Sequence, residues 1–488
     1  MDGGPVRRFL RVATAVLVVI GWVGSVPPAW AQAPVPTIED AETIFAQALE
    51  AFEEGDYGMA YRRFRLVFRT YDVNRKTTAA MLMAGKSLYR DGQFEEAIDV
   101  LDELIDRYPT SGYLAEARRV RRLAEEARDG AGGDRRVRTI GIILPIDGDH
   151  ATLAQALFTG IRIAIDEHNL LNPNDPIRMV FRNTGADASR AAERVLELAG
   201  EGAEAIIGPL YSPEAQAAAQ AADRAGVVLI PPLANDEAVS QGRTYVFQAN
   251  PTISIRGRLM GRFAMRGLRL DDFGIIAERD RDQISERMAE GFQDEVMLQG
   301  GTVHYYKVFS SRNDWEQLPD LIGADTVSMA RAVYMPIGGG ETIARVDAAL
   351  TSLDRMGLAG RIRVLGNTEW HRLPSAAKAS RYETTYSSDF HVDEEDASVI
   401  AFMETFAEIN GERPNPDQTI GRLAFSGYDV ARFLIPQMLG DDSRPLHERI
   451  RNAPEYQGLG LRIGFDNSNV NQALYFFRFR DGRVSLIR

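Results

Sequence analysis

The chain has 488 residues, of which 45% are hydrophobic and 26% are charged, so it can form two or three globular domains. Its formal net charge of -13 argues against binding to nucleic acid or to anionic lipid, because both favour a basic surface. The sequence contains no cysteine, which excludes disulfides, thiolate metal sites, a cysteine nucleophile and a lipid-anchored N-terminal cysteine.

Residues 1–31 have the pattern of an export signal. Arg7, Arg8 and Arg11 precede an apolar run from Val12 to Val26, and Ala29-Trp30-Ala31 supplies a cleavage site. An uncleaved membrane anchor is the alternative, but the apolar run is shorter than the roughly 20 residues that span a bilayer. We therefore expect cleavage after Ala31, a soluble periplasmic protein and no stable membrane insertion.

Residues 38–128 are predicted to form helical repeats. One pattern of glycine, small and aromatic residues occurs twice at the same spacing, in Gly55-Asp56-Tyr57 with Ala60 and Phe64, and in Gly92-Gln93-Phe94 with Ala97 and Leu101. This pattern resembles the tetratricopeptide repeat, which implies a docking surface for a protein partner. A helical spacer is the alternative. Residues 129–136 are polar and glycine-rich, and are predicted to be a linker.

From residue 137 onward, strands alternate with helices, which is typical of a doubly wound parallel sheet. Ile206 to Asn235 is the clearest βαβ unit. Its first strand ends at Gly208-Pro209, and the helix that follows is predicted to have Ser212 as its N-cap and Pro213 at its first position. Because both strands end at the same sheet edge, Ser212 and Asn235 are expected where ligands bind in open α/β sheets.

The remaining elements repeat this alternation and predict a second sheet after residue 273. Further strands are expected at 137–144, 177–183, 273–277, 302–308, 332–335 and 362–366, with a final strand pair at 461–465 and 473–480. Further helices are expected at 151–169, 186–200, 284–299, 314–322, 341–356, 397–410 and 419–439.

From about Arg138 to the end, the chain resembles the type I periplasmic binding proteins of the leucine/isoleucine/valine-binding family. The resemblance is carried by Ile207-Gly208-Pro209 with Ser212, Gly226-Val227 leading to Ile230-Pro231-Pro232, Val333-Tyr334 and Gly464-Phe465-Asp466. It implies two α/β lobes that clamp a small solute. Lobe 1 is expected at about 137–252 and 386–457, and lobe 2 at about 253–385 and 458–488. The chain crossings are placed near 250–257, 382–389 and 454–461.

Transferred residue by residue, the resemblance implies ligand contacts at Ser212, Ala234, Asn235, Asp280, Gln283 and Glu369. Ser212 matches the family's serine that holds a ligand carboxylate, and Glu369 lies near the family's acid that pairs with an amino group. The family's aromatic residues are missing at 280–284 and at Gly338-Gly339-Gly340. Free branched-chain amino acid is therefore a poor fit, and a larger, more polar solute or no ligand at all are the alternatives.

No catalytic, metal or cofactor site is predicted. The six histidines are dispersed, with no pair at metal-ligand spacing. Ser375 and Lys378 have the Ser-x-x-Lys spacing of penicillin-interacting enzymes, but no Lys-Thr-Gly follows them. We therefore expect a protein that is not an enzyme.

Two functions follow from the resemblance. The first is an exported solute-binding protein that holds an amino acid or derivative, a small peptide or a related carboxylate for an ABC importer, with the repeats docking on the importer permease. The second is a non-enzymatic activator or scaffold of a peptidoglycan synthase, because helical repeats before this fold also resemble penicillin-binding protein activator lipoproteins. Those lipoproteins are anchored through a cysteine, which this sequence lacks. An unidentified hydrolase is a third candidate, disfavoured because the sequence offers no nucleophile and base set.

Overall fold

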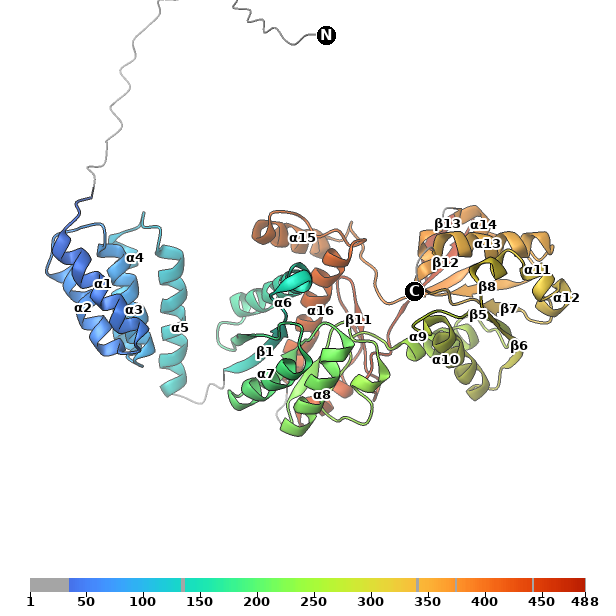
Figure 1. Cartoon of the computed structure of the whole chain (residues 1–488), viewed down its shortest axis with the longest axis horizontal. Coiled ribbons are helices and arrows are strands. Elements are labelled where there is room, and N and C mark those ends of the chain that lie inside the picture. The colour runs from blue at the N-terminus through green and yellow to red at the C-terminus, as the bar shows by residue number, and fades with distance from the viewer. Residues whose placement is uncertain (1–34, 133–136, 339–341, 374, 441–442, 488) are drawn as a thin grey trace, which may run out of the picture. The chain divides into compact units, whose positions relative to one another are not determined.

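The computed structural model describes residues 35–132, 137–338, 342–373, 375–440 and 443–487, and the chain divides into two compact units at residue 135 (Figure 1). The expected signal segment 1–31, its cleavage site and linker residues 133–136 lie outside the described residues. Within the described ranges, no helix is long and apolar enough to cross a membrane.

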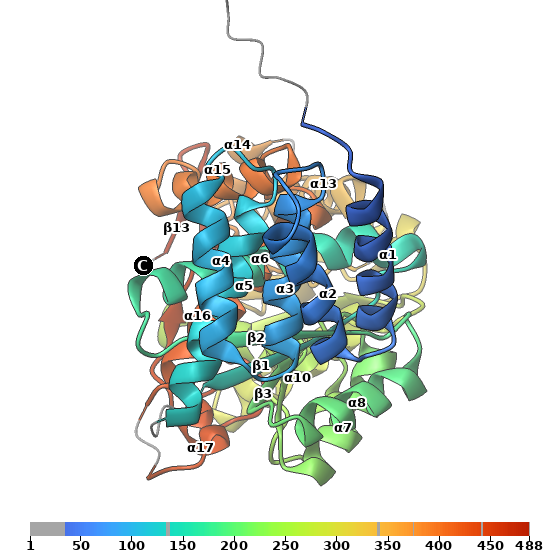
Figure 2. The ribbon, with the colours of Figure 1, turned by 90° about the vertical axis from the view of Figure 1, so that its left-hand side faces the viewer.

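The first unit consists of antiparallel helices packed side by side (Figure 2). They are α1 (Glu39–Glu53), α2 (Tyr57–Arg69), α3 (Thr77–Arg90), α4 (Phe94–Arg107) and α5 (Leu114–Gly132). The turns of the two predicted repeats use Gly55 and Gly92 with φ of 82° and 77°, a left-handed conformation that glycine adopts without strain. Both repeat alanines, Ala60 and Ala97, are fully buried. One boundary was wrong: residues 129–132 continue α5 and are not linker.

The first lobe of the second unit is a four-stranded parallel sheet in the order β2-β1-β3-β4. Its strands are β1 (Arg138–Leu144), β2 (Ile177–Asn183), β3 (Ala205–Ile207) and β4 (Val228–Ile230). Its helices are α6 (Ala151–Leu171), α7 (Ala188–Gly200), α8 (Ser212–Ala225), α15 (Ala397–Asn410), α16 (Thr419–Met438) and α17 (Leu446–Arg451), with 3-10 turns η1 (Gly148–His150) and η2 (Glu237–Val239).

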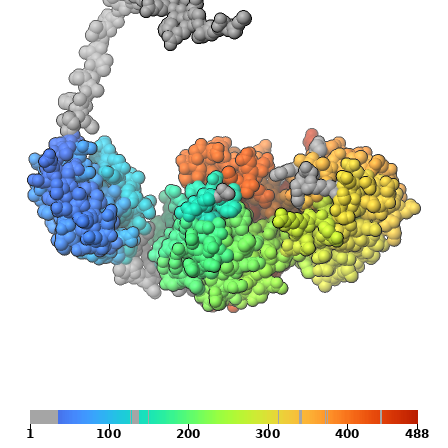
Figure 3. Space-filling model, viewed as in Figure 1, coloured from blue at the N-terminus to red at the C-terminus, as the bar shows by residue number. Residues whose placement is uncertain are grey.

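Alternate side chains of the first sheet face two hydrophobic cores. Ile143 and Ile206 pack with α7 and α8, whereas Ile142 and Ile207 pack with α6 and α16 on the other face. Segments far apart in the sequence therefore form one lobe, and the space-filling view shows α15 in orange beside the green surface of this lobe (Figure 3).

The second lobe is a seven-stranded sheet in the order β13-β12-β9-β8-β7-β5-β6. Its strands are β5 (Asp272–Glu278), β6 (Thr302–Phe309), β7 (Ala332–Tyr334), β8 (Arg363–Gly366), β9 (Thr385–Ser388), β12 (Tyr475–Arg480) and β13 (Arg483–Leu486). Its helices are α9 (Ile253–Arg266), α10 (Ile284–Leu298), α11 (Leu318–Leu321), α12 (Ala324–Val327), α13 (Thr342–Arg355) and α14 (Ala376–Ser380), with 3-10 turns η3 (Arg312–Trp315) and η4 (Thr368–Arg372). The pairing is parallel except for β12 and β13.

The expected two-lobed α/β architecture is confirmed, but two lobe boundaries were wrong. β9 belongs to the second sheet, so the second crossing follows Ser388. Leu461, Ile463 and Phe465 are buried in the first-lobe core with α16, so 458–465 is not part of lobe 2. The third crossing therefore lies between Phe465 and β12.

Two predicted elements also differ from the structure. The expected pairing of strands 461–465 and 473–480 does not form, because β11 (Arg462–Ile463) pairs with β10 (Tyr456–Gln457) and β12 pairs with β9 and β13. The single helix expected at 314–322 is replaced by η3 and the short α11.

Each lobe contains a helix pair that crosses at two glycines. In the first lobe, a Cβ added at Gly160 of α6 would lie 2.0 Å from the carbonyl oxygen of Ala424, and one at Gly427 of α16 would lie 2.2 Å from that of Leu157. In the second lobe, the same close approach occurs at Gly257 of α9 and Gly291 of α10. Only glycine permits such a separation, because any side chain would meet backbone of the partner helix.

The chain crossings are held together by a buried carboxylate. Asp389, in the second crossing, accepts a hydrogen bond from Arg256 at 2.9 Å and pairs with Arg422 of α16 at 3.3 Å. Arg256 also donates to the Asn250 side chain and the Pro251 carbonyl of the first crossing. Burial by itself would raise the pKa of Asp389, but the two guanidiniums outweigh it and lower that pKa to about 2.

Further contacts join the other crossings. Glu237 of the first lobe accepts from Ser254 at the start of α9 and pairs with Arg287 of α10. The Asn471 side chain, in the third crossing, donates to the Ala249 carbonyl at 2.8 Å. Within the first lobe, Asp429 of α16 accepts from three backbone N–H groups at residues 459–461, each at 2.8 Å, and burial raises its pKa to about 7.

Replacing Gly160 with alanine should destabilise the second unit. Alanine is the better helix former by about 1 kcal/mol, but its Cβ would separate α6 from α16, and overpacking costs about 1–3 kcal/mol. We expect urea unfolding to show a net loss for Gly160→Ala. Gly200→Ala is the matched control, because nothing lies within 4 Å of a Cβ at that helix end. Equal stability of Gly160→Ala and wild type would contradict the close-crossing interpretation.

Asp389→Asn should remove a pH-dependent contribution to stability. Since the folded pKa lies near 2, below the ordinary 3.8, this contribution is present above about pH 4 and is lost as pH falls toward 2. At pH 7 the substitution leaves Arg256 without its buried partner, at a cost of roughly 3 kcal/mol.

Thermal unfolding from pH 2 to 7 measures both effects. The control is Asp166→Asn, at an exposed ion pair with Arg162, which should change stability by less than about 1 kcal/mol. An unchanged acid limb for Asp389→Asn would show that the buried pair does not stabilise the fold.

Candidate functional site

The carboxyl ends of β3 and β4 bring together two of the predicted site residues. α8 begins at Ser212, and the backbone N–H of Asn235 donates to the Ser212 hydroxyl at 3.4 Å. Ser212 is not the N-cap that the sequence pattern indicates. Tyr211 occupies that position without a side-chain cap, so the serine hydroxyl is directed to the neighbouring strand end.

Ala234, also predicted to contact a ligand, is part of the support of this edge. Its side chain is buried in the core under α8, and its carbonyl accepts from Gln248 at 2.9 Å. The Asn250 amide donates to the carbonyl of Leu233 at 2.9 Å. These bonds fix the segment that presents Asn235.

Four further residues gather at this edge and were not predicted. Glu214 is buried on the first turn of α8, and Thr184 donates to its Oε2 at 3.1 Å from the end of β2. Burial raises the pKa of Glu214. The rings of His150 and Tyr211 lie 5.0 Å apart beside them. Nothing in the local sequence marks Glu214 as buried, since Thr184 comes thirty positions earlier in the chain.

At the second sheet, the Asp280 carboxylate is hydrogen-bonded to the backbone of its own loop and of the helix that follows. Its Oδ1 accepts from the N–H groups of Asp282 and Ile284 at 2.9 and 3.0 Å, and its Oδ2 accepts from Ser285 at 3.0 Å. The carboxylate thus caps the N-terminus of α10. Gln283 is the N-cap residue, in a left-handed conformation with φ of 55°, and its side chain is exposed.

A buried ion pair that was not predicted fixes the loop after β7. Glu278 pairs with Arg345 and accepts from Trp315 at 2.8 Å and from the Gly338 N–H at 3.0 Å. Arg345 donates in turn to the Gly338 carbonyl at 2.7 Å. The Asn367 side chain bonds both backbone groups of Ile337. The backbone of 337–338 is therefore satisfied within the lobe.

Glu369, the remaining predicted site residue, lies on η4, where Thr342 donates to its Oε2 at 3.0 Å. No hydrogen bond or ion pair between described residues links Glu369 or Asp280 to Ser212 or Asn235. The structure therefore places the predicted residues in two groups, one at each sheet edge.

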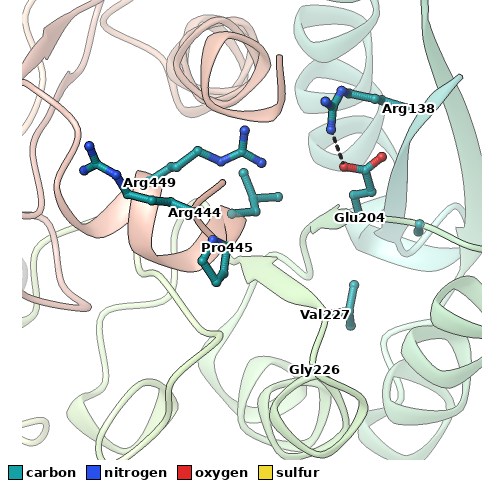
Figure 4. A pocket seen from close by; sticks show the side chains of 9 residues that line it. Arg138, Glu204, Gly226, Val227, Arg444, Pro445 and Arg449 are labelled. Carbon is teal, nitrogen blue, oxygen red and sulfur yellow. Dashed lines mark hydrogen bonds and ion pairs between the residues drawn. The ribbon is translucent and has the colours of Figure 1, made fainter. Parts of the chain in front are cut away.

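The pocket drawn in Figure 4 is not at either group. It measures about 290 Å³ and lies at the amino ends of β1, β3 and β4, where Arg138 donates to Glu204 at 3.0 Å. Arg444 and Arg449 line its other side. Among the residues with described side chains, no group of three or more acidic or histidine residues could hold a metal ion.

Comparison with known proteins places these features in a family. A profile described as "Periplasmic binding protein" matches residues 138–483, and a tetratricopeptide repeat profile matches residues 79–111, which cover most of α3 and all of α4. No curated protein matches the chain.

One solved structure supports the same fold, and two others are reported as further similar proteins. A protein from Rhodospirillum rubrum, named for branched-chain amino acid ABC transport, is 18% identical with a TM-score of 0.57, covering 72% of this chain and 100% of its own. LivJ from Streptococcus pneumoniae, solved with isoleucine, is 20% identical with a TM-score of 0.44, covering 72% and 99%. A Rhodopseudomonas palustris solute-binding protein, solved with 3,4-dihydroxybenzoic acid, is 16% identical with a TM-score of 0.45, covering 72% and 95%.

The alternating layers, the two sheet edges and the profile match over well more than half of the sequence lead to one conclusion. The chain belongs to the periplasmic binding protein family, with a tetratricopeptide repeat in its N-terminal helical unit.

Proposed function

We propose that the protein is an exported, non-enzymatic solute-binding protein that holds a small carboxylate-bearing ligand for an ABC importer. The observation that carries the proposal is the meeting of Ser212 and Asn235 at the carboxyl edge of the first sheet. The family assignment supports the class of protein, and the edge supports the position of the ligand.

The chemistry of this edge suits a carboxylate. In the first turn of α8, the backbone N–H groups of Ser212 and Glu214 have no acceptor within the helix, whereas Pro213 has no N–H, and the Ser212 hydroxyl lies beside them. Glu214 is two residues from Ser212, so an ionised carboxylate there would repel a bound anion. Burial raises the pKa of Glu214, which favours the neutral form and reduces that repulsion. The Asn235 amide supplies both a donor and an acceptor.

On the second lobe, Glu369 and Gln283 are the groups that remain for a ligand. Thr342 bonds one oxygen of Glu369, which leaves the other to accept from an amino or hydroxyl group of the solute. Gln283 is exposed and offers an amide. Asp280 contributes indirectly, because its carboxylate fixes the start of α10. The ligand class is an amino acid derivative, a small peptide or a related carboxylate.

In this proposal the helical repeats dock a protein partner, the importer permease, at the periplasmic face of the inner membrane. Repeat helices of this kind form curved surfaces that bind other proteins. The tetratricopeptide profile match at residues 79–111 supports that role.

A second candidate is a scaffold or activator of a peptidoglycan synthase. One observation favours it: the backbone at 337–338 and the Asp280 carboxylate are already hydrogen-bonded within the second lobe. A lobe with few groups left for a ligand fits a protein whose partners are other proteins. The repeats would then contact the synthase.

Ser212→Ala should weaken binding of a carboxylate ligand by roughly 1–3 kcal/mol, because a hydrogen bond to a charged group is lost. Isothermal titration with carboxylates identified by mass spectrometry of small molecules released from the purified protein measures this. Ser398→Ala is the matched control, since Ser398 also lies in the first turn of a helix but its hydroxyl bonds the N-cap Asp396. Equal affinity in Ser212→Ala would exclude this edge as the carboxylate site.

Asn235→Trp should separate the two functions. A tryptophan at this strand end fills the space beside Ser212, so a solute-binding protein loses its ligand, with at least a tenfold rise in Kd. Binding to a peptidoglycan synthase through the repeats would be unchanged. Parallel titration of ligand and pull-down of synthase with wild type and Asn235→Trp give both readouts. Synthase capture by both proteins, with no released small molecule, would favour the scaffold function over the solute-binding one.

A further inference from the structure

A second pocket of the first lobe lies far from the strand edge. It measures about 330 Å³ and is formed by the end of α6, the second half of α16 and the segment before β10. His168, which lines it, is 17 residues beyond the start of α6 at Ala151, so the pocket is roughly 25 Å along that helix from the carboxyl edge. It is thus independent of the proposed ligand site.

Most of the lining is apolar. Phe433 and Tyr456 have ring centroids 6.2 Å apart at 54°, and Pro436 and Pro454 border them. Phe433 is 2% exposed and fixes the floor. A volume near 330 Å³ is at the lower end for ligand pockets, and it suits a compact ligand on the order of ten non-hydrogen atoms.

One guanidinium, that of Arg432, lines the pocket without a direct ion-pair partner among the described residues. The Arg432 guanidinium lies beside the hydroxyls of Tyr428 and Tyr456, and it opposes the rise that burial causes in both tyrosine pKa values. Among the described residues, no acidic side chain forms an ion pair with Arg432.

The other ionisable groups nearby are already engaged. Glu455 pairs with Arg462 at 2.6 Å, Glu167 accepts from Tyr428 at 2.7 Å, and the His168 ring contacts the Asp175 carbonyl at 3.0 Å. None of these groups forms an ion pair with Arg432.

Pro436 adds a second polar feature. It lies inside α16 and has no backbone N–H, so the carbonyl of Arg432, four residues earlier, loses its helical donor. Both Arg432 and Pro436 line the pocket. A cation and an acceptor without its helical partner therefore lie at one end of an apolar hollow.

We propose that this pocket is a second small-molecule site, which takes a compact carboxylate with an apolar, ring-sized body. The carboxylate pairs with Arg432, and the body packs between Tyr456, Phe433 and the two prolines. The site does not depend on the function proposed for the strand edge. A neutral amide of the same shape lacks the charge and binds more weakly.

Isothermal titration of the full chain with phenylacetate and with phenylacetamide tests the proposal. Phenylacetate should bind at least tenfold more tightly than phenylacetamide. Arg432→Gln should weaken phenylacetate at least tenfold and leave phenylacetamide unchanged. Arg162→Gln, at an exposed pair on α6, should bind phenylacetate as wild type does. If Arg432→Gln unfolds, Pro454→Trp blocks the pocket mouth from an exposed position and should abolish binding.

Three results would overturn the proposal. The first is that wild type does not bind phenylacetate up to millimolar concentration, and the second is that it binds both probes equally. Alternatively, binding is lost in Ser212→Ala and kept in Arg432→Gln, which assigns the probe to the strand edge instead.

Discussion

The second unit depends on Asp389, a carboxylate buried between two guanidiniums where the chain passes between its lobes. Arg256 reaches it from the start of α9, and Arg422 reaches it from α16, so one acid joins elements of both lobes. An isolated buried charge would be expensive, and the two arginines make it tolerable. The same geometry lowers the pKa of Asp389 to about 2, so the interaction persists at any ordinary pH. Because the first and second crossings meet there, this contact joins the two lobes at their junction.

At each sheet edge a helix begins near the end of a strand, but the two edges differ in whether the N–H groups at the helix start already have acceptors. In the first lobe, α8 begins without a side-chain cap, and Ser212 lies beside its open N–H groups. In the second lobe, Asp280 fills the same role that a bound anion would have at α10. This difference is the reason that we propose the first lobe for a ligand carboxylate. The same difference is the reason for our second proposal, a scaffold function.

Strong periodic elements were predictable, because their signal is local. The strands from 137 to 230 and the repeat helices agree with the sequence patterns within a few residues. α9 was not predicted: its two glycines, Gly257 and Gly261, lower helix propensity, yet they let it approach α10. The lobe membership of 461–465 was misplaced for a related reason. Nothing near β11 in the sequence reveals that its apolar residues pack on α16.

In the candidate site, too, the role of a single residue depends on contacts that the local sequence does not reveal. Ser212 and Asn235 could be paired from the sequence, because parallel strands end at a common edge. Asp280 could not be interpreted from its residue type, since an acid before a helix can serve a ligand or cap the helix. Counting backbone donors decides between them: three N–H groups already bond its carboxylate. Glu214 is the reverse case, an acid that reads as a solvated first-turn residue but is buried against Thr184. For both acids, burial and hydrogen-bond partners determine the role. The partner of Glu214 comes from a segment distant in the sequence, and the partners of Asp280 depend on the exact path of the loop before α10.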